Sequence, residues 1–129
     1  MANNIANYEE DKLLDHSLGT TEHTFVTTIY VALYTDDPTD ADSGTEVTGG
    51  SYARVGGTFA SASGGSTYNS SAATFATASA AWGVVTHVGI RDALTAGNLK
   101  WHGPVTVTKD VGDGDTFEFA VGELDVSLN

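Results

Sequence analysis

Two clusters of carboxylates are the strongest candidates in this sequence for metal binding or acid catalysis. One lies within residues 36–50 and the other within residues 110–118. Loops rich in oxygen ligands bind Ca²⁺, but neither cluster follows the spacing of an EF-hand loop. Paired carboxylates also hydrolyse glycosides when they face each other across a sugar cleft, whereas these acids crowd turn-forming segments. We predict no catalytic acids and no metal ion, with calcium in either loop as the alternative.

The four histidines and the serines do not form a catalytic group either. Zinc sites usually contain closely spaced pairs such as H-x₃-H, whereas His16 and His23, the nearest pair, are seven residues apart. His87 and His102 fall on predicted strands, where they could approach each other across a sheet. The sequence has no G-x-S-x-G motif, and its glycine-rich stretches lack the lysine of a phosphate-binding loop. It therefore predicts a protein that is not an enzyme and needs no cofactor.

Composition limits the partners that this chain can have. Its 129 residues fit one domain, and the absence of cysteine excludes disulfides. Seventeen acids and five scattered bases give a formal net charge of −12, so we expect no contact with nucleic acid or with a membrane. No apolar run is long enough to span a membrane and no secretion signal is recognisable, which predicts synthesis in the cytoplasm.

A helix of about three turns is expected near the N-terminus. Asn7 is the predicted cap, acidic residues follow in the first turn, and Gly19 is the predicted stop. Three leucines form a narrow apolar stripe on this acidic helix, namely Leu13, Leu14 and Leu18. Because so short a helix is marginal alone, the stripe must dock, either on the sheet of the same chain or on a neighbouring subunit. We assign residues 1–22 to a helical arm and residues 23–129 to a single β body.

The remaining sequence is typical of a β protein, with short apolar or alternating segments between turns rich in Gly, Ser and Asp. The strongest predicted strands are 27–35 and 82–92. In the second, alternation from Val84 through Val88 to Ile90 predicts one apolar face. Further short strands are predicted at 52–55, 58–60, 99–102, 105–108, 116–119 and 124–128. The expected fold is all-β, an antiparallel sandwich or barrel of about seven to nine short strands with one short N-terminal α-helix.

Six aromatic residues allow three interpretations, namely stacking on a sugar, anchoring a protein interface and packing in the core. They are Tyr30, Tyr34, Tyr52, Tyr68, Trp82 and Trp101. Core packing is the expectation for most of them. Trp82 and Trp101 are the strongest candidates for the core because they flank the second strong strand.

Four segments that together span nearly the whole chain resemble a known family. They are EDKLLDHSL, IYVALYTDDPTDADSGTEVTGGSYARV, AATFATASAAWGVVTHVGIRDA and GNLKWHGPVTVTKDVGDGDTFEFAVGELDVSL. The sequence is similar to a family of small virion proteins of tailed bacteriophages, often labelled tail-fibre-like, and YVALYTDDP and WGVVTHVGI are its most specific blocks. The resemblance implies a structural component of the virion that is assembled in the host cytoplasm, and it brings no catalytic residues with it.

Two positions on a virion suit such a domain. Because the chain is short and lacks a coiled-coil or collagen-like shaft, we expect a capsid decoration (cement) protein that binds the outer capsid surface and stabilises the shell. The alternative is a tail-fibre or baseplate protein involved in host attachment, with glycan binding as one role. The expected partners are the major capsid protein and copies of the chain itself, with a trimer as one arrangement, and an acidic domain suits a basic patch. The predicted interface residues are Leu13, Leu14, Leu18, Asp36, Asp37, Asp40, Asp42 and Glu46.

Overall fold

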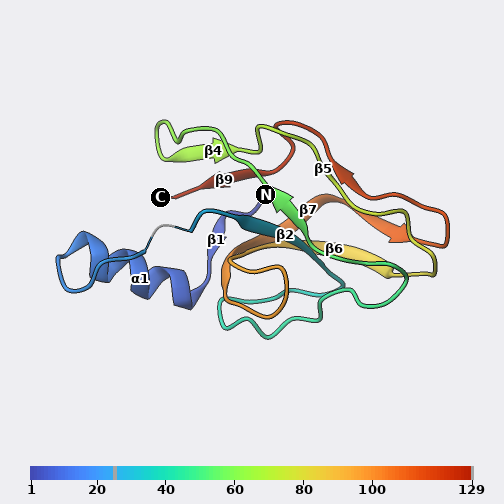
Figure 1. Cartoon of the computed structure of the whole chain (residues 1–129), viewed down its shortest axis with the longest axis horizontal. Coiled ribbons are helices and arrows are strands. Elements are labelled where there is room, and N and C mark those ends of the chain that lie inside the picture. The colour runs from blue at the N-terminus through green and yellow to red at the C-terminus, as the bar shows by residue number, and fades with distance from the viewer. Residues whose placement is uncertain (25, 129) are drawn as a thin grey trace.

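The computed structural model describes residues 1–24 and 26–128 and shows a β body from which one helix extends (Figure 1). The elements in chain order are β1 (Asn4–Ile5), α1 (Asn7–Ser17), β2 (Ile29–Tyr34), β3 (Val55–Gly57), β4 (Ser66–Tyr68), β5 (Ala73–Thr74), β6 (Gly83–Arg91), β7 (Leu99–Val111), β8 (Glu118–Phe119) and β9 (Asp125–Ser127). The prediction of an antiparallel all-β fold with one N-terminal helix is confirmed. The predicted body includes Phe25 and Asn129, which lie outside the described residues.

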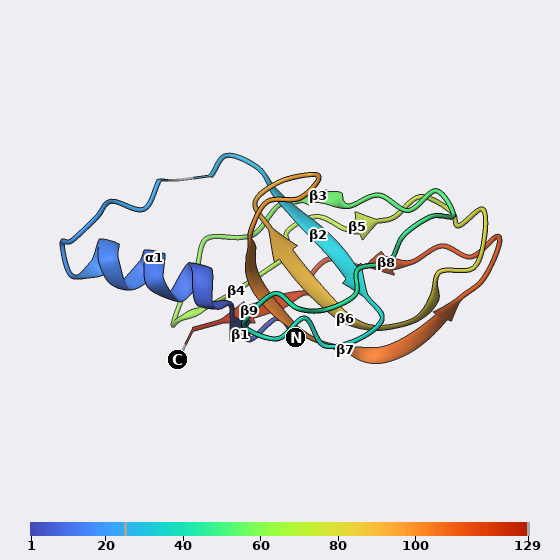
Figure 2. The ribbon, with the colours of Figure 1, turned by 90° about the horizontal axis from the view of Figure 1, so that it is seen from below.

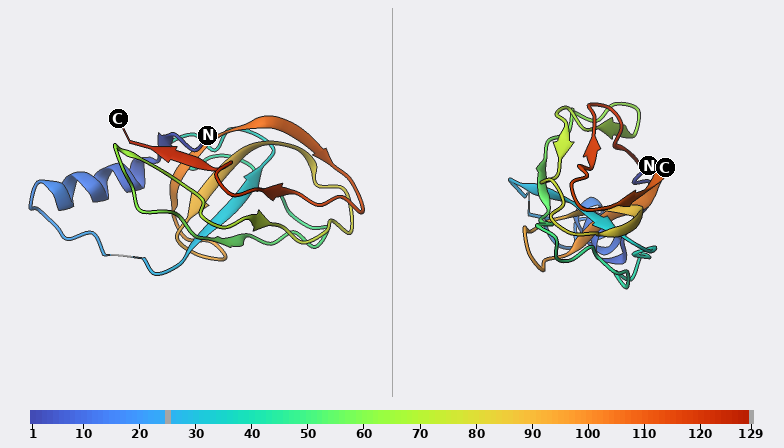
Figure 3. Two further views of the ribbon diagram at one scale, coloured as in Figure 1. Left: turned by 90° about the horizontal axis from the view of Figure 1, so that it is seen from above. Right: turned by 90° about the vertical axis from the view of Figure 1, so that its right-hand side faces the viewer.

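Five strands form the main sheet, in the order β1-β7-β6-β2-β3. Two smaller sheets, β4 with β9 and β5 with β8, pack against it through a shared apolar core. The result is a sandwich-like body that does not close into a barrel (Figure 3). Of the two predicted architectures, the structure therefore shows the sandwich.

Aromatic and branched apolar side chains fill the space between the sheets. The core cluster includes Val31, Leu33, Val85, Val88, Phe117 and Phe119. The Tyr52 ring stacks on Phe75 with centroids 6.1 Å apart and meets Trp82 edge-on at 5.4 Å. Trp82 is buried and Trp101 packs partly buried against the core, so the expectation for these two residues is confirmed. Tyr68 is exposed and is not part of the core.

A register shift in β6 changes which of its side chains reach the core. The pairing with β7 shifts between Val85 and His87. Val85 is therefore fully buried and Val84 is exposed, while Val88 and Ile90 are buried. The prediction that Val84 shares the apolar face was wrong, because strict alternation does not survive a break in the ladder.

Two glycine-containing segments that were predicted as breaks lie inside strands. β7 runs without interruption through Gly103 and Pro104. β1 pairs with β7 only at residues 101–102. Beyond these residues β7 has a neighbouring strand on one side only, and a proline is tolerated at such an edge position. Gly56 and Gly57 belong to β3 at the other edge of the sheet. The predicted separations at both places were wrong, because edge positions accept residues that a central strand excludes.

The helix α1 projects from one end of the body instead of lying across a sheet (Figure 2). It begins at Asn7, and the N-cap is Ala6 with no side-chain hydrogen bond, so the prediction of Asn7 as the cap was wrong. Glu9 and Glu10 lie in the first turn as expected, and Gly19 follows the helix with a φ of 77°. Carboxylates near the positive end of the helix dipole, and not a capping side chain, favour its start.

Candidate functional site

The leucine stripe of α1 is largely uncovered. Leu14 is 58% exposed and Leu18, just beyond the helix, is 77% exposed, whereas Leu13 is half-buried. Docking of the stripe on the sheet of the same chain was one of the two predicted alternatives, and it is wrong for Leu14 and Leu18. Two exposed leucines four positions apart on a projecting helix form an apolar face that is open to a partner.

A buried charge network holds α1 to the body. Lys100 on β7 donates from Nζ to Glu9 Oε2 at 2.6 Å, and both side chains are buried. Glu9 Oε1 lies 3.2 Å from Nε2 of His23, and the amide of His23 donates to His16 Nδ1 at 3.1 Å. The arm is therefore positioned by polar contacts that do not involve its exposed leucines. Sequence reasoning missed the Glu9–Lys100 pair, because its members are 91 positions apart and no local pattern connects them.

The predicted interface acids lie on one loop, residues 36–50, which we call the acidic loop. Asp36 accepts a hydrogen bond from the Thr45 amide at 2.6 Å, and Asp37 accepts one from the Thr39 amide at 2.9 Å. Both contacts lie within the acidic loop and shape its turns. These acids therefore have a structural role, and their place in an interface stays a prediction.

The acidic loop also meets the base of the arm. The amide of Asn7 donates to the Asp40 carbonyl at 2.9 Å, and Asp40 Oδ1 lies 2.8 Å from His102 Nε2. Leu14 and Leu18 follow Asn7 by two and three helical turns, so the structure does not bring the acids and the exposed leucines into one patch. Of the predicted acids, Asp40 lies at the base of the arm, whereas Asp42 and Glu46 are held by arginines of the body.

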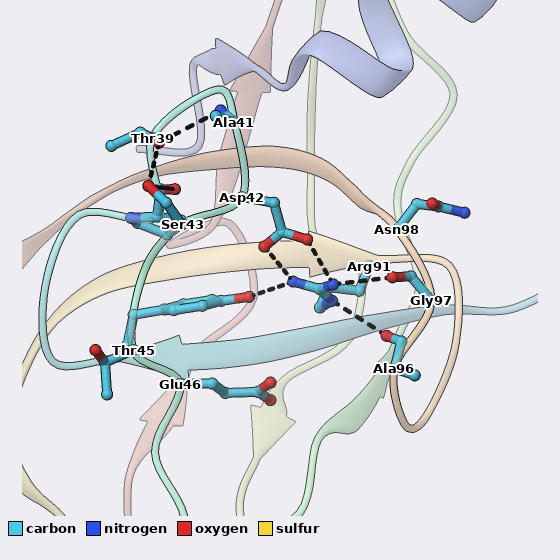
Figure 4. A network of polar contacts seen from close by, with 12 residues as sticks. Thr39, Ala41, Asp42, Ser43, Thr45, Glu46, Arg91, Ala96, Gly97 and Asn98 are labelled. Carbon is cyan, nitrogen blue, oxygen red and sulfur yellow. Dashed lines mark hydrogen bonds and ion pairs between the residues drawn. The ribbon is translucent and has the colours of Figure 1, made fainter.

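Asp42 is held by a buried arginine on β6 (Figure 4). Arg91 Nη1 and Nη2 donate to the two Asp42 oxygens at 2.7 and 2.8 Å, and Nη1 also donates to the Tyr34 hydroxyl at 2.8 Å. A further bond from Nη2 reaches the Gly97 carbonyl at 3.0 Å. Burial alone would lower the pKa of Arg91, but hydrogen bonds to Asp42 and Tyr34 outweigh it and the pKa is raised overall. Arg91 is thus a permanent cation that joins two loops to the sheet.

A second arginine repeats this arrangement for Glu46. Arg54 donates to Glu46 from Nε at 2.8 Å and from Nη2 at 2.7 Å. Its Nη1 donates to the carbonyls of Ala93 and Ala96, both at 2.8 Å. Hydrogen bonding to Glu46 raises the pKa of Arg54. Like Arg91, this residue connects the acidic loop to the loop between β6 and β7.

Three of the five basic side chains are thereby withdrawn from the surface. Arg54, Arg91 and Lys100 are each paired with a carboxylate, and their own side chains are less than a tenth exposed. Lys12 and Lys109 are the remaining bases, against 17 acids in the chain. The surface is therefore strongly acidic. It favours contact with a basic protein surface and opposes contact with a phosphate backbone.

The strand histidines do not build a metal centre. The register of β6 on β7 keeps His87 and His102 from lying directly opposite each other. His102 Nδ1 is buried without a hydrogen-bond partner, and the nearest carboxylate oxygen, on Asp37, is 3.6 Å away. Within residues 1–24 and 26–128, no three His, Asp or Glu side chains are grouped so as to hold a metal ion. In the same part of the chain, no helix has the length and apolarity needed to cross a membrane.

An acidic β-sandwich with uncovered leucines on a projecting arm has the features of a structural or binding module. The sequence profile of the family described as podophage GP4 fiber I protein gp80 matches residues 4–127. The chain belongs to this family of phage virion structural proteins, and the resemblance stated from the sequence is confirmed. A search of the curated proteins found no match.

Proposed function

We propose that the chain is a non-enzymatic structural subunit of a phage fibre that attaches to a neighbouring virion protein through α1. The observation that carries this proposal is the exposure of Leu14 on α1 and of Leu18 at its C-cap, because this helix projects from its own body. The family description names a fibre protein, which favours the fibre alternative over the capsid decoration expected from the sequence. Capsid decoration, with the major capsid protein as partner, is the competing function.

Burial of the exposed leucines would supply part of the attachment energy. Because each leucine is already partly covered, the pair contributes about 2–4 kcal/mol on burial. A stable protein contact generally buries about 1,000 Å² or more, so surface around the leucines must take part as well. Within one helical turn of the leucines lie the acids Glu10, Asp11 and Asp15. A groove with an apolar floor and a rim of Lys or Arg complements this face of the arm.

The test compares an arm variant with a control that removes the same kind of side chain elsewhere. Leu14→Ser/Leu18→Ser alters the arm, and Leu94→Ser/Leu128→Ser alters two comparably exposed leucines outside it. Both are introduced into phage that makes this chain, and copies per purified particle are counted by quantitative mass spectrometry. The number of copies per particle should fall at least about tenfold for the arm variant, because the lost contact energy exceeds about 1.4 kcal/mol. The control should match the wild type, and both purified variants should keep their unfolding temperature.

Equal incorporation of the arm variant and the control would contradict attachment through α1. Cryo-EM of the wild-type particle then separates the two functions. Density at a fibre supports the proposal, whereas density repeated over the capsid lattice supports decoration and would identify the major capsid protein as the partner. The same maps would show whether copies of the chain contact one another, in a trimer or in another arrangement.

A further inference from the structure

The body is open along one side, between β7 and β8. β7 pairs with β6 at Leu99, at residues 101–104 and at residues 109–111, with a register shift between the last two groups. On its other side β1 pairs with it only at residues 101–102. β8 pairs with β5 alone, and no ladder joins β7 to β8 among the described residues. A side-chain hydrogen bond crosses the far end of the opening, where Lys109 Nζ donates to the Thr116 carbonyl at 2.7 Å. Two strand edges therefore face each other without a strand between them.

The N-terminal segment already occupies one end of this opening (Figure 3). Its residues Asn4 and Ile5 pair with β7, while the amide of Ala2 donates at 3.0 Å to the carbonyl of Asp125, the first residue of β9. The approach is so close that a Cβ on Gly103 would lie 1.8 Å from the carbonyl oxygen of Met1, and only glycine allows it. The molecule thus shows that an extended chain fits between β7 and the small sheets.

Beyond Met1 the opening continues as a groove of about 330 Å³. We call it the β7 groove, and its lining consists of Met1, Val105, Thr106, Val107, Phe117, Glu118, Phe119 and Glu123. Val107 is 78% exposed although it lies within a strand, and the two phenylalanines are buried at the other wall. Both carboxylates are exposed. The groove therefore combines an apolar wall, two anions and an unpaired strand edge.

We propose that the β7 groove binds an extended segment of another protein, which adds a strand to the outer edge of β7 in line with the N-terminal segment. Main-chain hydrogen bonds to β7 would supply affinity, as they do wherever a peptide extends a sheet. An apolar residue of the segment would contact Val107, and a Lys or Arg would face Glu118 and Glu123.

A second copy of the chain does not fit the groove as well as a different, basic protein does. The bases that remain at the surface are Lys12 and Lys109. The first lies in a helix and the second already spans the end of the groove. Lys12 therefore does not belong to an extended segment, and Lys109 lies in β7 itself, where its ammonium group already donates to the Thr116 carbonyl. The site is distinct from the leucine face of α1, so the two can be tested separately.

The probe is a synthetic peptide of alternating lysine and valine, titrated into the full ¹⁵N-labelled chain. Resonances of residues 105–109 and 117–119 should shift, and amide exchange along β7 should slow. A peptide of the same sequence that is N-methylated at alternate residues keeps the charge and the apolar content but loses donors for strand pairing. It should bind at least about tenfold more weakly, because each lost hydrogen bond weakens binding.

Two variants make the result specific to the groove. Val107→Ser should weaken binding of the unmodified peptide about tenfold, because it removes the apolar contact. Leu94→Ser changes an exposed leucine on the loop between β6 and β7, away from the groove lining, and should leave the affinity unchanged. Equal binding of the two peptides, or shifts spread over the acidic surface, would show charge attraction alone and overturn the proposal. A dimer of the chain with its interface in the β7 groove would overturn the choice of occupant.

Discussion

At the residue scale, Arg54 and Arg91 act as cross-links between loops that no strand connects. Arg91→Met removes the hydrogen bonds of the guanidinium to Asp42, Tyr34 and the Gly97 carbonyl while roughly keeping the volume of the side chain. Asp42 can recover some solvation because its side chain is 35% exposed, whereas the Tyr34 hydroxyl stays buried. The free energy of unfolding should fall by about 2–4 kcal/mol, as measured by urea denaturation.

Lys109→Met is the matched control for this substitution. Lys109 is an exposed base whose one side-chain bond is to the Thr116 carbonyl, and its replacement should change stability by less than about 0.5 kcal/mol. The loss of stability for Arg91→Lys should lie between those of the other two variants, because an ammonium cannot reach both oxygens of Asp42 and the loop carbonyl at once. If the free energy of unfolding fell as little for Arg91→Met as for Lys109→Met, the loops would not depend on Arg91 for their stability.

At the scale of elements, the buried ion pair between Glu9 and Lys100 is central to the network that holds α1. An isolated helix of 11 residues is marginal in water, and Leu14 and Leu18 do not dock on the body. Glu9→Gln keeps the shape of the side chain but leaves the ammonium of Lys100 buried without a counter-charge. We expect the amides of α1 to exchange at least about tenfold faster, while those of β2 and β6 keep their protection.

Hydrogen–deuterium exchange with mass spectrometry measures this difference on intact protein. Glu10→Gln is the control, since Glu10 is the exposed neighbour of Glu9 in the same turn and its removal should leave the exchange of α1 nearly unchanged. If the two variants exchanged alike, the ion pair would not be what holds the arm.

The same contrast between local and distant contacts explains what the sequence could predict. β2 and β6 lie within the predicted segments 27–35 and 82–92, because runs of β-branched and aromatic residues are local signals. The exposure of Val84 could not be predicted, since it depends on how β7 pairs with β6. The leucine stripe was found from spacing alone. The exposure of Leu14 and Leu18 could not be predicted, since the arm is held by contacts such as that between Glu9 and Lys100, which are distant in the sequence.

At the scale of the whole molecule, burial of three bases leaves the acids to repel one another across the surface. The net charge of −12 therefore opposes compaction, whereas the internal ion pairs are shielded from salt by their burial. Added salt shortens the screening length from about 30 Å at 0.01 M to about 10 Å at 0.1 M. Salt should thus weaken the repulsion between exposed carboxylates more than it weakens the buried pairs.

Two properties of the chain should consequently respond to salt in opposite directions. The unfolding temperature of the isolated chain should rise between 0.01 and 0.1 M NaCl, as followed by circular dichroism, because screening relieves the repulsion at the surface. Attachment to a basic partner should weaken over the same range, because the attraction is screened as well. A fall of the unfolding temperature with salt would mean that the ion pairs, and not the surface repulsion, dominate the electrostatics of the fold. Potassium sulfate at matched ionic strength controls for effects specific to chloride.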